Sequence, residues 1–244
     1  MKFLHKKSLT LFTLLLLTIN SFASHVAGGD ISYVYVGNGR YVVCLNLFVD
    51  CNPNSAAAPP TGDISIESSC GGTISLSLPL ENPGGTEVSQ LCAADIPFST
   101  CNGGTLPGMR RWTYCDTVQM DTTCDYTIKW DLCCRNQLIV NQPAPTSVGL
   151  YLEATLNHSA TGNLPNNSAS FFADPIPYVC SGFPINYSYQ VIEPDGDSLV
   201  FTMIDPESTE NVTIPFDTFN GYSLTEPFGT PGTILNSTDR KSVV

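Results

Sequence analysis

The stretch Asp125-Tyr-Thr-Ile-Lys-Trp-Asp-Leu-Cys-Cys-Arg-Asn136 decides the fold class of this chain. Its apolar and aromatic side chains fall at every second position, from Tyr126 through Ile128 and Trp130 to Leu132, with polar side chains between them. Successive side chains of an extended strand point to opposite faces, so this alternation predicts a strand that buries one face. We expect Trp130, one of 2 tryptophans, to lie in the core.

Two adjacent cysteines, Cys133 and Cys134, follow directly on this strand. If the strand continues through them, their side chains point to opposite faces, and we expect disulfides to two different, non-adjacent partners. A ring closed between the two cysteines is the alternative. We expect Arg135, the next residue, to anchor a buried carboxylate or backbone carbonyls, with ligand binding as the alternative role.

Residues 1–23 have the pattern of a secretory signal peptide. Lysines precede an apolar run at residues 11–18, and Ser21-Phe-Ala23 supplies small residues at the positions that a signal peptidase reads. A membrane anchor is the alternative, but it needs about 20 apolar residues, and Asn20 interrupts the run. We therefore expect the mature chain to be secreted or displayed on the outer cell surface, without membrane insertion.

The chain contains 10 cysteines, an even number that in an exported protein predicts disulfides rather than metal sites. No Cys-x-x-Cys and no Cys/His cluster with zinc-finger spacing is present. The pairing cannot be deduced from spacing, although the loop between Cys92 and Cys101 is short enough for one bridge to close it. The predicted structural cysteines are Cys44, Cys51, Cys70, Cys92, Cys101, Cys115, Cys124, Cys133, Cys134 and Cys180.

The composition is acidic, with a formal net charge of −12 at pH 7. A surface of this sign repels nucleic acid and anionic membranes, so neither is expected as a partner. It favours cations such as Ca²⁺, or it serves solubility alone.

Alternating segments separated by Gly, Pro and Asn turns recur along the mature chain, without any apolar 3.6-residue period. A Gly37-Asn-Gly39 turn between two such segments predicts a hairpin. The predicted strands cover residues 31–36, 40–49, 63–67, 73–78, 109–118, 126–132 and 147–156. The sequence therefore predicts an all-β protein in which residues 24–172 form a disulfide-stapled β-sandwich.

A boundary is expected after this domain, because residues 157–170 are rich in Asn, Ser, Gly and Pro, and Asp174-Pro-Ile-Pro177 has the composition of a stiff linker. Residues 184–192 and 198–204 alternate as strands. Residues 173–238 are too few for a complete immunoglobulin-type sandwich of about 100 residues. We expect them to form a truncated Ig-, cadherin- or PKD-like β module.

Several motifs together resemble the N-terminal region of large secreted surface proteins of Bacteroidota. The motifs are Ser24-His-Val-Ala-Gly-Gly-Asp-Ile-Ser-Tyr33, Val49-Asp-Cys51, Trp130 with Cys133-Cys-Arg-Asn136, Pro175-Ile-Pro-Tyr-Val-Cys180 and Glu193-Pro-Asp-Gly-Asp-Ser-Leu-Val200. In that family this region precedes repeated PKD- or cadherin-like sandwiches and a gliding-motility-associated, type IX sorted C-terminal domain. The resemblance implies that this chain is a fragment, and residues 239–244 look like a non-native, adapter-derived tail.

The acidic turn at residues 193–197 is the candidate metal site. Glu193, Asp195 and Asp197 lie close together in sequence, and Asp205 follows the next predicted strand. Carboxylate oxygens are the ligands that Ca²⁺ takes, so these four residues form the candidate calcium site and Ca²⁺ is the one cofactor considered. The alternative is a plain Pro-Asp-Gly turn whose acids are solvated.

Catalysis is not indicated by the sequence. It has no Gly-x-Ser-x-Gly motif, and we expect the two histidines of the mature chain, His25 and His158, to be structural or surface residues. A glycosidase carboxylate pair leaves no sequence signature and stays an alternative. The alternating tyrosines, Tyr33 with Tyr35 and Tyr187 with Tyr189, suit ordinary sheet packing or a sugar-binding platform.

These observations together predict a non-catalytic part of a modular secreted or cell-surface protein that serves adhesion or contact with extracellular matrix. Its partner is expected to be an extracellular glycan or protein surface. The alternative is a glycan-binding accessory region of a carbohydrate-active enzyme whose catalytic domain lies outside this sequence.

Overall fold

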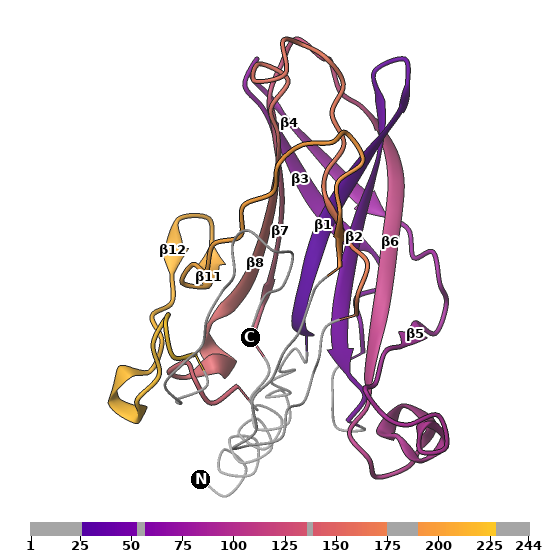
Figure 1. The fold of residues 1–244 in the computed structure, drawn as a ribbon, viewed down its shortest axis with the longest axis vertical. Helices are drawn as coiled ribbons and strands as arrows, with labels where there is room; N and C mark the ends of the chain where they lie inside the picture. The colour runs from indigo at the N-terminus through magenta and orange to yellow at the C-terminus, as the bar shows by residue number, and fades with distance from the viewer. Residues whose placement is uncertain (1–25, 53–56, 136–138, 175–189, 228–244) are drawn as a thin grey trace, which may run out of the picture.

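The computed structural model describes residues 26–52, 57–135, 139–174 and 190–227. In these residues two four-stranded antiparallel sheets pack together as a sandwich (Figure 1). The first sheet has the order β1 (Val26–Gly37), β2 (Arg40–Asp50), β6 (Met109–Gln119), β5 (Thr86–Glu87). The second has the order β4 (Thr73–Leu78), β3 (Gly62–Ser68), β7 (Tyr126–Cys133), β8 (Gly149–Leu156). The predicted all-β sandwich is confirmed.

The described connections contain four short 3-10 helices. They are η1 (Ile96–Phe98), η2 (Thr100–Asn102), η3 (Pro145–Ser147) and η4 (Thr218–Asn220). No helix in this part of the chain is long and apolar enough to cross a membrane.

Strand β2 shows why the two sheets pack. Tyr41, Val43, Leu45, Leu47 and Val49 are buried, and the residues between them are partly exposed. Burying one apolar face of each sheet against the other removes that surface from water, at roughly 25 cal/mol per Å². The core of the domain therefore lies between the sheets.

Strand β7 follows the predicted pattern, with Tyr126, Ile128 and Trp130 buried in the core. Lys129, on the opposite face, is also only 7% exposed. Its Nζ lies 2.7 Å from a carboxylate oxygen of Glu67 and 2.7 Å from one of Glu210. The two carboxylates therefore compensate the positive charge of the buried ammonium group.

The predicted hairpin between β1 and β2 is confirmed. Asn38 and Gly39 both have positive φ, 55° and 69°, as a type I′ turn requires at its two central residues. A Cβ at Gly39 would lie 2.5 Å from the side-chain nitrogen of Gln119, so space as well as conformation favours glycine there.

Three disulfides join distant parts of the sandwich. Cys44–Cys115 links β2 to β6, Cys51–Cys101 links the end of β2 to η2, and Cys70–Cys124 links the β3–β4 turn to the β6–β7 turn. The suggested Cys92–Cys101 bridge is wrong, because Cys101 pairs with Cys51. Within the described residues Cys92 has no disulfide partner, and Cys180 lies outside them.

The fourth disulfide corrects the prediction for the paired cysteines. Cys133 and Cys134 are bonded to each other and not to two distant partners. The prediction assumed that the strand alternation continues through both residues, but β7 ends at Cys133 and the peptide bond between the two is cis.

Beyond β8 the described chain forms two small strand pairs: β9 (Ser170–Phe171) with β10 (Val191–Ile192), and β11 (Glu207–Thr209) with β12 (Val212–Thr213). The predicted strand at residues 198–204 is wrong, since no strand forms there and Val200 is 79% exposed. Alternation supplies an apolar face, but a strand also needs a hydrogen-bonded neighbour. Most of the other predicted strand, residues 184–192, lies outside the described residues.

Candidate functional site

The acids of the candidate calcium site mostly contact the protein itself. The two carboxylate oxygens of Asp195 accept hydrogen bonds from the backbone N and Nδ2 of Asn167, at 2.6 and 2.9 Å. Glu193 accepts one from the backbone N of Asp197 at 2.7 Å. Across the described residues, which include Asp205, no three His, Cys, Asp or Glu side chains are grouped so that they could hold a metal ion. The calcium site stays a prediction. The Glu193 contact lies within the turn, whereas the Asp195 contacts reach Asn167, 28 positions earlier in the chain.

His158 is a structural residue, as predicted. It is fully buried, with Nε2 2.7 Å from the hydroxyl of Tyr41 and Nδ1 2.7 Å from the carbonyl oxygen of Cys124. A carbonyl only accepts, so Nδ1 carries the proton and donates it, and Nε2 accepts from the tyrosine. Both ring nitrogens are thus engaged, joining β2 to the β6–β7 turn. His25 lies outside the described residues.

Arg135 holds backbone carbonyls, as predicted. It is buried, and its Nε and Nη2 donate to the carbonyl oxygens of Gly149 and Glu207 at 2.7 and 2.8 Å. Burial lowers the pKa of the guanidinium. Arg135 therefore fixes the start of β11 against the start of β8.

Two of the tyrosines considered as a sugar platform serve sheet packing. Tyr33 is buried, and its hydroxyl donates to the carbonyl oxygen of Thr155 at 2.7 Å. Burial raises the pKa of Tyr33 to about 12. The Tyr35 ring stacks in a tilted geometry on Tyr41, 5.2 Å between centroids. Tyr187 and Tyr189 lie outside the described residues.

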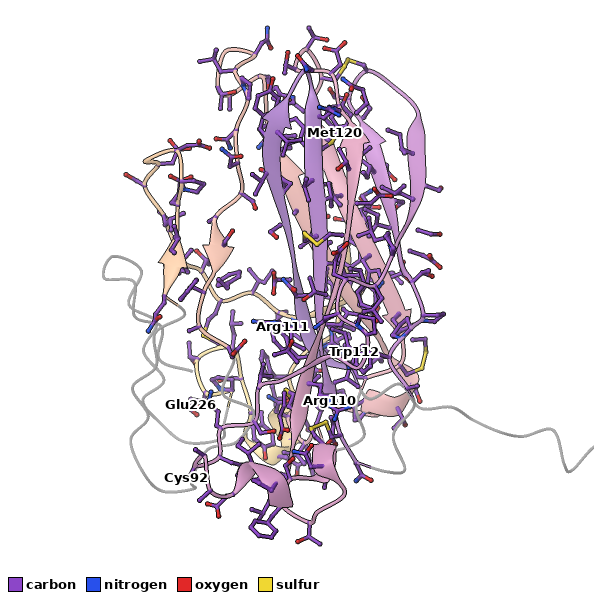
Figure 2. The ribbon with its side chains drawn as sticks, turned by 90° about the vertical axis from the view of Figure 1, so that its right-hand side faces the viewer. Cys92, Arg110, Arg111, Trp112, Met120 and Glu226 are labelled. Atoms are coloured by element: carbon purple, nitrogen blue, oxygen red, sulfur yellow. A yellow bond between two sulfur atoms is a disulfide. The ribbon has the colours of Figure 1, made fainter. Side chains whose placement is uncertain are left out.

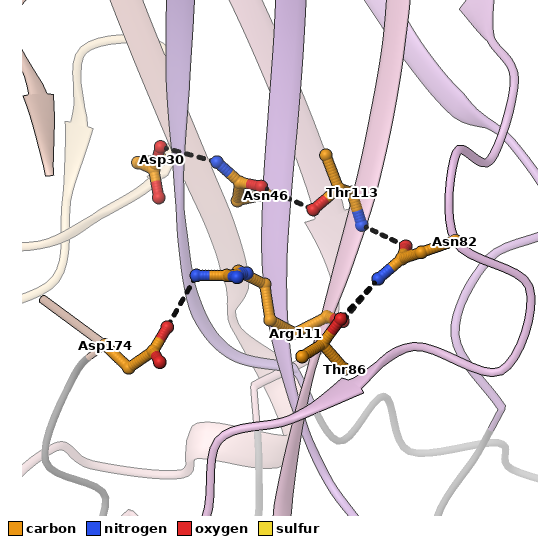
Figure 3. Close-up of polar contacts among 7 residues, drawn as sticks. All are labelled: Asp30, Asn46, Asn82, Thr86, Arg111, Thr113 and Asp174. Atoms are coloured by element: carbon orange, nitrogen blue, oxygen red, sulfur yellow. Dashed lines mark hydrogen bonds and ion pairs between the residues drawn. The ribbon is translucent and has the colours of Figure 1, made fainter. Parts of the chain in front are cut away.

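The first sheet carries a polar network on its outer face (Figure 3). Asn46 donates to Asp30 and accepts from the Thr113 hydroxyl, and the backbone N of Thr113 donates to Asn82. Together these bonds connect β1, β2 and β6 with the segment before β5. Burial raises the pKa of Asp30, against the opposing effects of the Asn46 hydrogen bond and the Arg111 charge.

An ion pair next to this network brings residues after β8 onto the sheet. Arg111, on β6, lies 2.6 Å from a carboxylate oxygen of Asp174 (Figure 3). Both side chains are about one-third exposed, so solvent screens the pair and it contributes little to stability. Its main effect is to position the chain that follows β9.

The sequence analysis missed a recess of about 230 Å³ at the end of the sandwich where β2 ends and β6 begins. Its lining residues are Val49, Asp50, Cys51, Asn52, Ala57, Ala58, Thr100, Cys101, Arg110 and Trp112. They come from residues 49–58 and from residues 100–112, about 40 positions later, so no local sequence pattern predicts the recess. The one available signal was the Arg110-Arg111-Trp112 run in a chain with few basic residues.

The lining of the recess includes the indole of Trp112 and the charged side chains of Asp50 and Arg110; Figure 2 labels Arg110 and Trp112, both on β6. Arg110 Nη2 donates to the carbonyl oxygen of Cys101 at 2.7 Å, which fixes the guanidinium beside the Cys51–Cys101 disulfide. Among the described residues, Asp50 accepts a hydrogen bond from the backbone N of Asn52, at 3.0 Å. An indole, a guanidinium and a carboxylate on one small concave surface suit a polar molecule with one apolar face.

Comparisons with protein-family models, curated proteins and solved structures found no match to this chain.

Proposed function

We propose that this chain is the non-catalytic N-terminal part of a modular secreted or cell-surface protein and that it serves adhesion or contact with extracellular matrix. The observation that carries the proposal is the distribution of its long-range disulfides. Cys70–Cys124 joins the β3–β4 and β6–β7 turns at one end of the sandwich, Cys44–Cys115 lies in the middle of β2 and β6, and Cys51–Cys101 joins the end of β2 to η2 at the other end.

These disulfides suit an oxidising compartment outside the cytoplasm. They join residues that are 71, 50 and 54 positions apart. By the chain-entropy relation, each bridge of this length stabilises the fold by about 4 kcal/mol through the unfolded state. A sandwich held at both ends and in the middle resists unfolding and proteolysis, which an exposed attachment module requires.

The resemblance to surface proteins of Bacteroidota supports the modular part of the proposal. On this basis residues 1–23 direct export, residues 24–172 form the outward domain, and residues 173–238 begin a PKD- or cadherin-like module in a type IX sorted protein. Two buried cations hold that segment to the sandwich, Arg135 through the carbonyl oxygen of Glu207 and Lys129 through the carboxylate of Glu210.

Antibodies against the sandwich, applied to intact producing cells and to their medium, test this function. We expect labelling at the surface or in the medium, and we expect deletion of the gene to reduce attachment of the cells to a coated surface. Restoring the gene is the control. A protein retained in the cytoplasm, or attachment that does not change on deletion, would refute the proposal.

The recess favours a second candidate, a glycan-binding region of a carbohydrate-active protein. Sugar rings present one apolar face and a polar rim, which match Trp112 and the Asp50 and Arg110 side chains. Its volume of about 230 Å³ limits the contact to one or two sugar units.

Glycan-array screening of the mature chain, followed by calorimetry on any positive glycan, tests this candidate. We expect Asp50→Asn to weaken binding by about tenfold, the effect of losing one charged hydrogen bond. Arg40→Gln, at the exposed start of β2, is a matched control outside the recess and should leave affinity unchanged. Binding that survives Asp50→Asn at full strength, or a screen without any positive glycan, excludes the recess as a glycan site.

A further inference from the structure

Strand β4 is the open edge of the sandwich among the four edges that the structure describes. The β1 edge is covered, because the backbone N of Tyr33 donates to Ser168 and that of Tyr35 to Asn167, at 2.8 and 2.7 Å. Strand β11 lies against the β8 edge, and β5 spans only two residues. Strand β4 is the edge strand of the second sheet. It pairs with β3 on one side, and no strand of the described chain pairs with its other edge.

The core is incompletely covered along β4. Its inward-facing residues become more exposed along the strand, from Leu78, which is fully buried, through Leu76 to Ile74, which is 39% exposed. The cause lies in the opposite sheet, where β5 pairs with β6 only at Arg110 and Arg111. At the level of Ile74, no further strand of the described residues extends the first sheet to cover it.

Residues 73–77 of β4 read the same in both directions by residue class. Around Ser75 stand two aliphatic residues, Ile74 and Leu76, and outside them two hydroxyl residues, Thr73 and Ser77. None is charged and none is proline, so the charges and prolines with which proteins usually block an edge strand are missing here. Such symmetry is what a two-fold contact between identical chains requires.

We propose that β4 is a self-association edge, which pairs antiparallel with β4 of a second copy of this chain, centred on Ser75. Ile74 then lies opposite Leu76 of the second copy, on the face of the joined sheet that packs on the core. The Ser75 residues of the two copies lie opposite each other on the solvent-facing side of the sheet. The pairing joins two four-stranded sheets into one continuous sheet and covers the apolar edge. This goes beyond an adhesive role, since it names a second copy of the chain as the partner.

Contacts with the rest of the sandwich fix both ends of β4 in place. Cys70, in the turn that precedes β4, is bonded to Cys124. After β4 the chain crosses to the first sheet, where the carbonyl oxygen of Pro79 accepts a bond from the backbone N of Cys115. The strand therefore loses little freedom when a partner adds to it.

The acidity of the chain sets how the contact should depend on salt. The nearest acids are Asp63 and Glu67 on β3, opposite Ser77 and Thr73 in register. In the dimer, Asp63 of one copy is separated from Glu67 of the other by three strand spacings, about 14 Å. That exceeds the screening length of about 8 Å at physiological ionic strength, so salt should strengthen association of these acidic chains.

Sedimentation of the oxidised mature chain from about 10 μM to about 1 mM, the range of weak complexes, tests the proposal. We expect a monomer–dimer equilibrium that shifts toward dimer between low and physiological salt. Amide hydrogen exchange at residues 73–77 should slow as the dimer forms.

Charge variants test the register. Ser75→Lys and Ser75→Asp each place two like charges opposite one another at the two-fold axis, so each variant alone should be monomeric. An equimolar mixture should recover a dimer, because Lys and Asp then face each other. Ser75 is exposed, so both variants should keep the thermal stability of the wild type.

Thr117→Lys, at an exposed position on the outer face of β6, is the matched control and should dimerise like the wild type. The proposal is overturned if the wild type stays monomeric at every concentration, even if the edge binds some other peptide. It is equally overturned if Ser75→Lys dimerises as the wild type does.

Discussion

Removal of the Cys44–Cys115 disulfide is expected to destabilise the protein far more than removal of Cys133–Cys134. The first bridge joins residues that are 71 positions apart and the second joins neighbours. For a loop of that length the chain-entropy relation gives about 15 cal/mol/K, or about 4 kcal/mol at 25 °C. A ring between adjacent residues closes no loop of chain, so its loss should cost less than about 1 kcal/mol by the same relation.

The comparison is clean because both bridges can be replaced without opening the core. Cys44 and Cys115 are partly exposed on the outer face of the first sheet, where serine fills the same space. Cys133 is exposed at the end of β7. The test uses two double variants, Cys44→Ser with Cys115→Ser and Cys133→Ser with Cys134→Ser.

Urea unfolding followed by tryptophan fluorescence measures both variants, since Trp112 and Trp130 both pack in the core. A loss of about 4 kcal/mol lowers the melting temperature by about 8–16 °C in a domain of 150–250 residues. Equal losses in the two double variants, or a larger loss from the Cys133–Cys134 pair, would refute the reasoning that these bridges act through loop closure.

Three further substitutions probe buried polar groups. His158→Phe removes one hydrogen-bond partner of the buried Tyr41 hydroxyl and the donor to the Cys124 carbonyl oxygen, so we expect a loss of about 2–4 kcal/mol in urea unfolding. A Tyr41→Phe change in the same chain should recover part of this loss. Arg135→Met removes the side-chain donors to the carbonyl oxygens of Gly149 and Glu207, so we expect the free energy of unfolding to fall by about 2–3 kcal/mol. We also expect faster amide exchange at β11, and unchanged exchange there would contradict the anchoring role of Arg135. Asp30→Asn should raise the melting temperature at pH 7, because burial raises the pKa of Asp30 in the folded state and its ionised form therefore opposes folding. That gain should fade as the pH falls through the folded-state pKa and then below the ordinary pKa of 3.8, where the wild-type carboxyl is protonated in both states. A gain that persists at full size at pH 3 would contradict this reasoning.

The sequence predicted those parts of the fold in which a local pattern decides the outcome. Alternation placed the buried faces of β2 and β7, and the Gly37-Asn-Gly39 turn fixed the first hairpin, because strand faces and I′ turns depend on neighbouring residues. The same pattern failed at residues 198–204, where alternation is present but the described chain offers no neighbouring strand.

Features that depend on tertiary contacts were beyond the sequence. Cysteine pairing is set by which strands become neighbours, so a short spacing suggested Cys92–Cys101 where the fold joins Cys101 to Cys51. The recess at Trp112 and the two hydrogen bonds of His158 likewise assemble residues that are tens of positions apart. The open edge at β4 also required the order of the sheet, which alternation alone does not supply.

The stretch at residues 125–136 organises the protein in a way that its alternation alone did not reveal. Its inner face, with Trp130, fills the core, as predicted. Its outer face holds Lys129, which pairs with Glu67 within the sandwich and with Glu210 beyond it. Its end holds Arg135, which fixes the carbonyl oxygen of Glu207. This stretch thus contributes side chains to the core and also attaches the segment that follows the sandwich. We therefore expect the β11–β12 hairpin to move with the sandwich rather than independently of it.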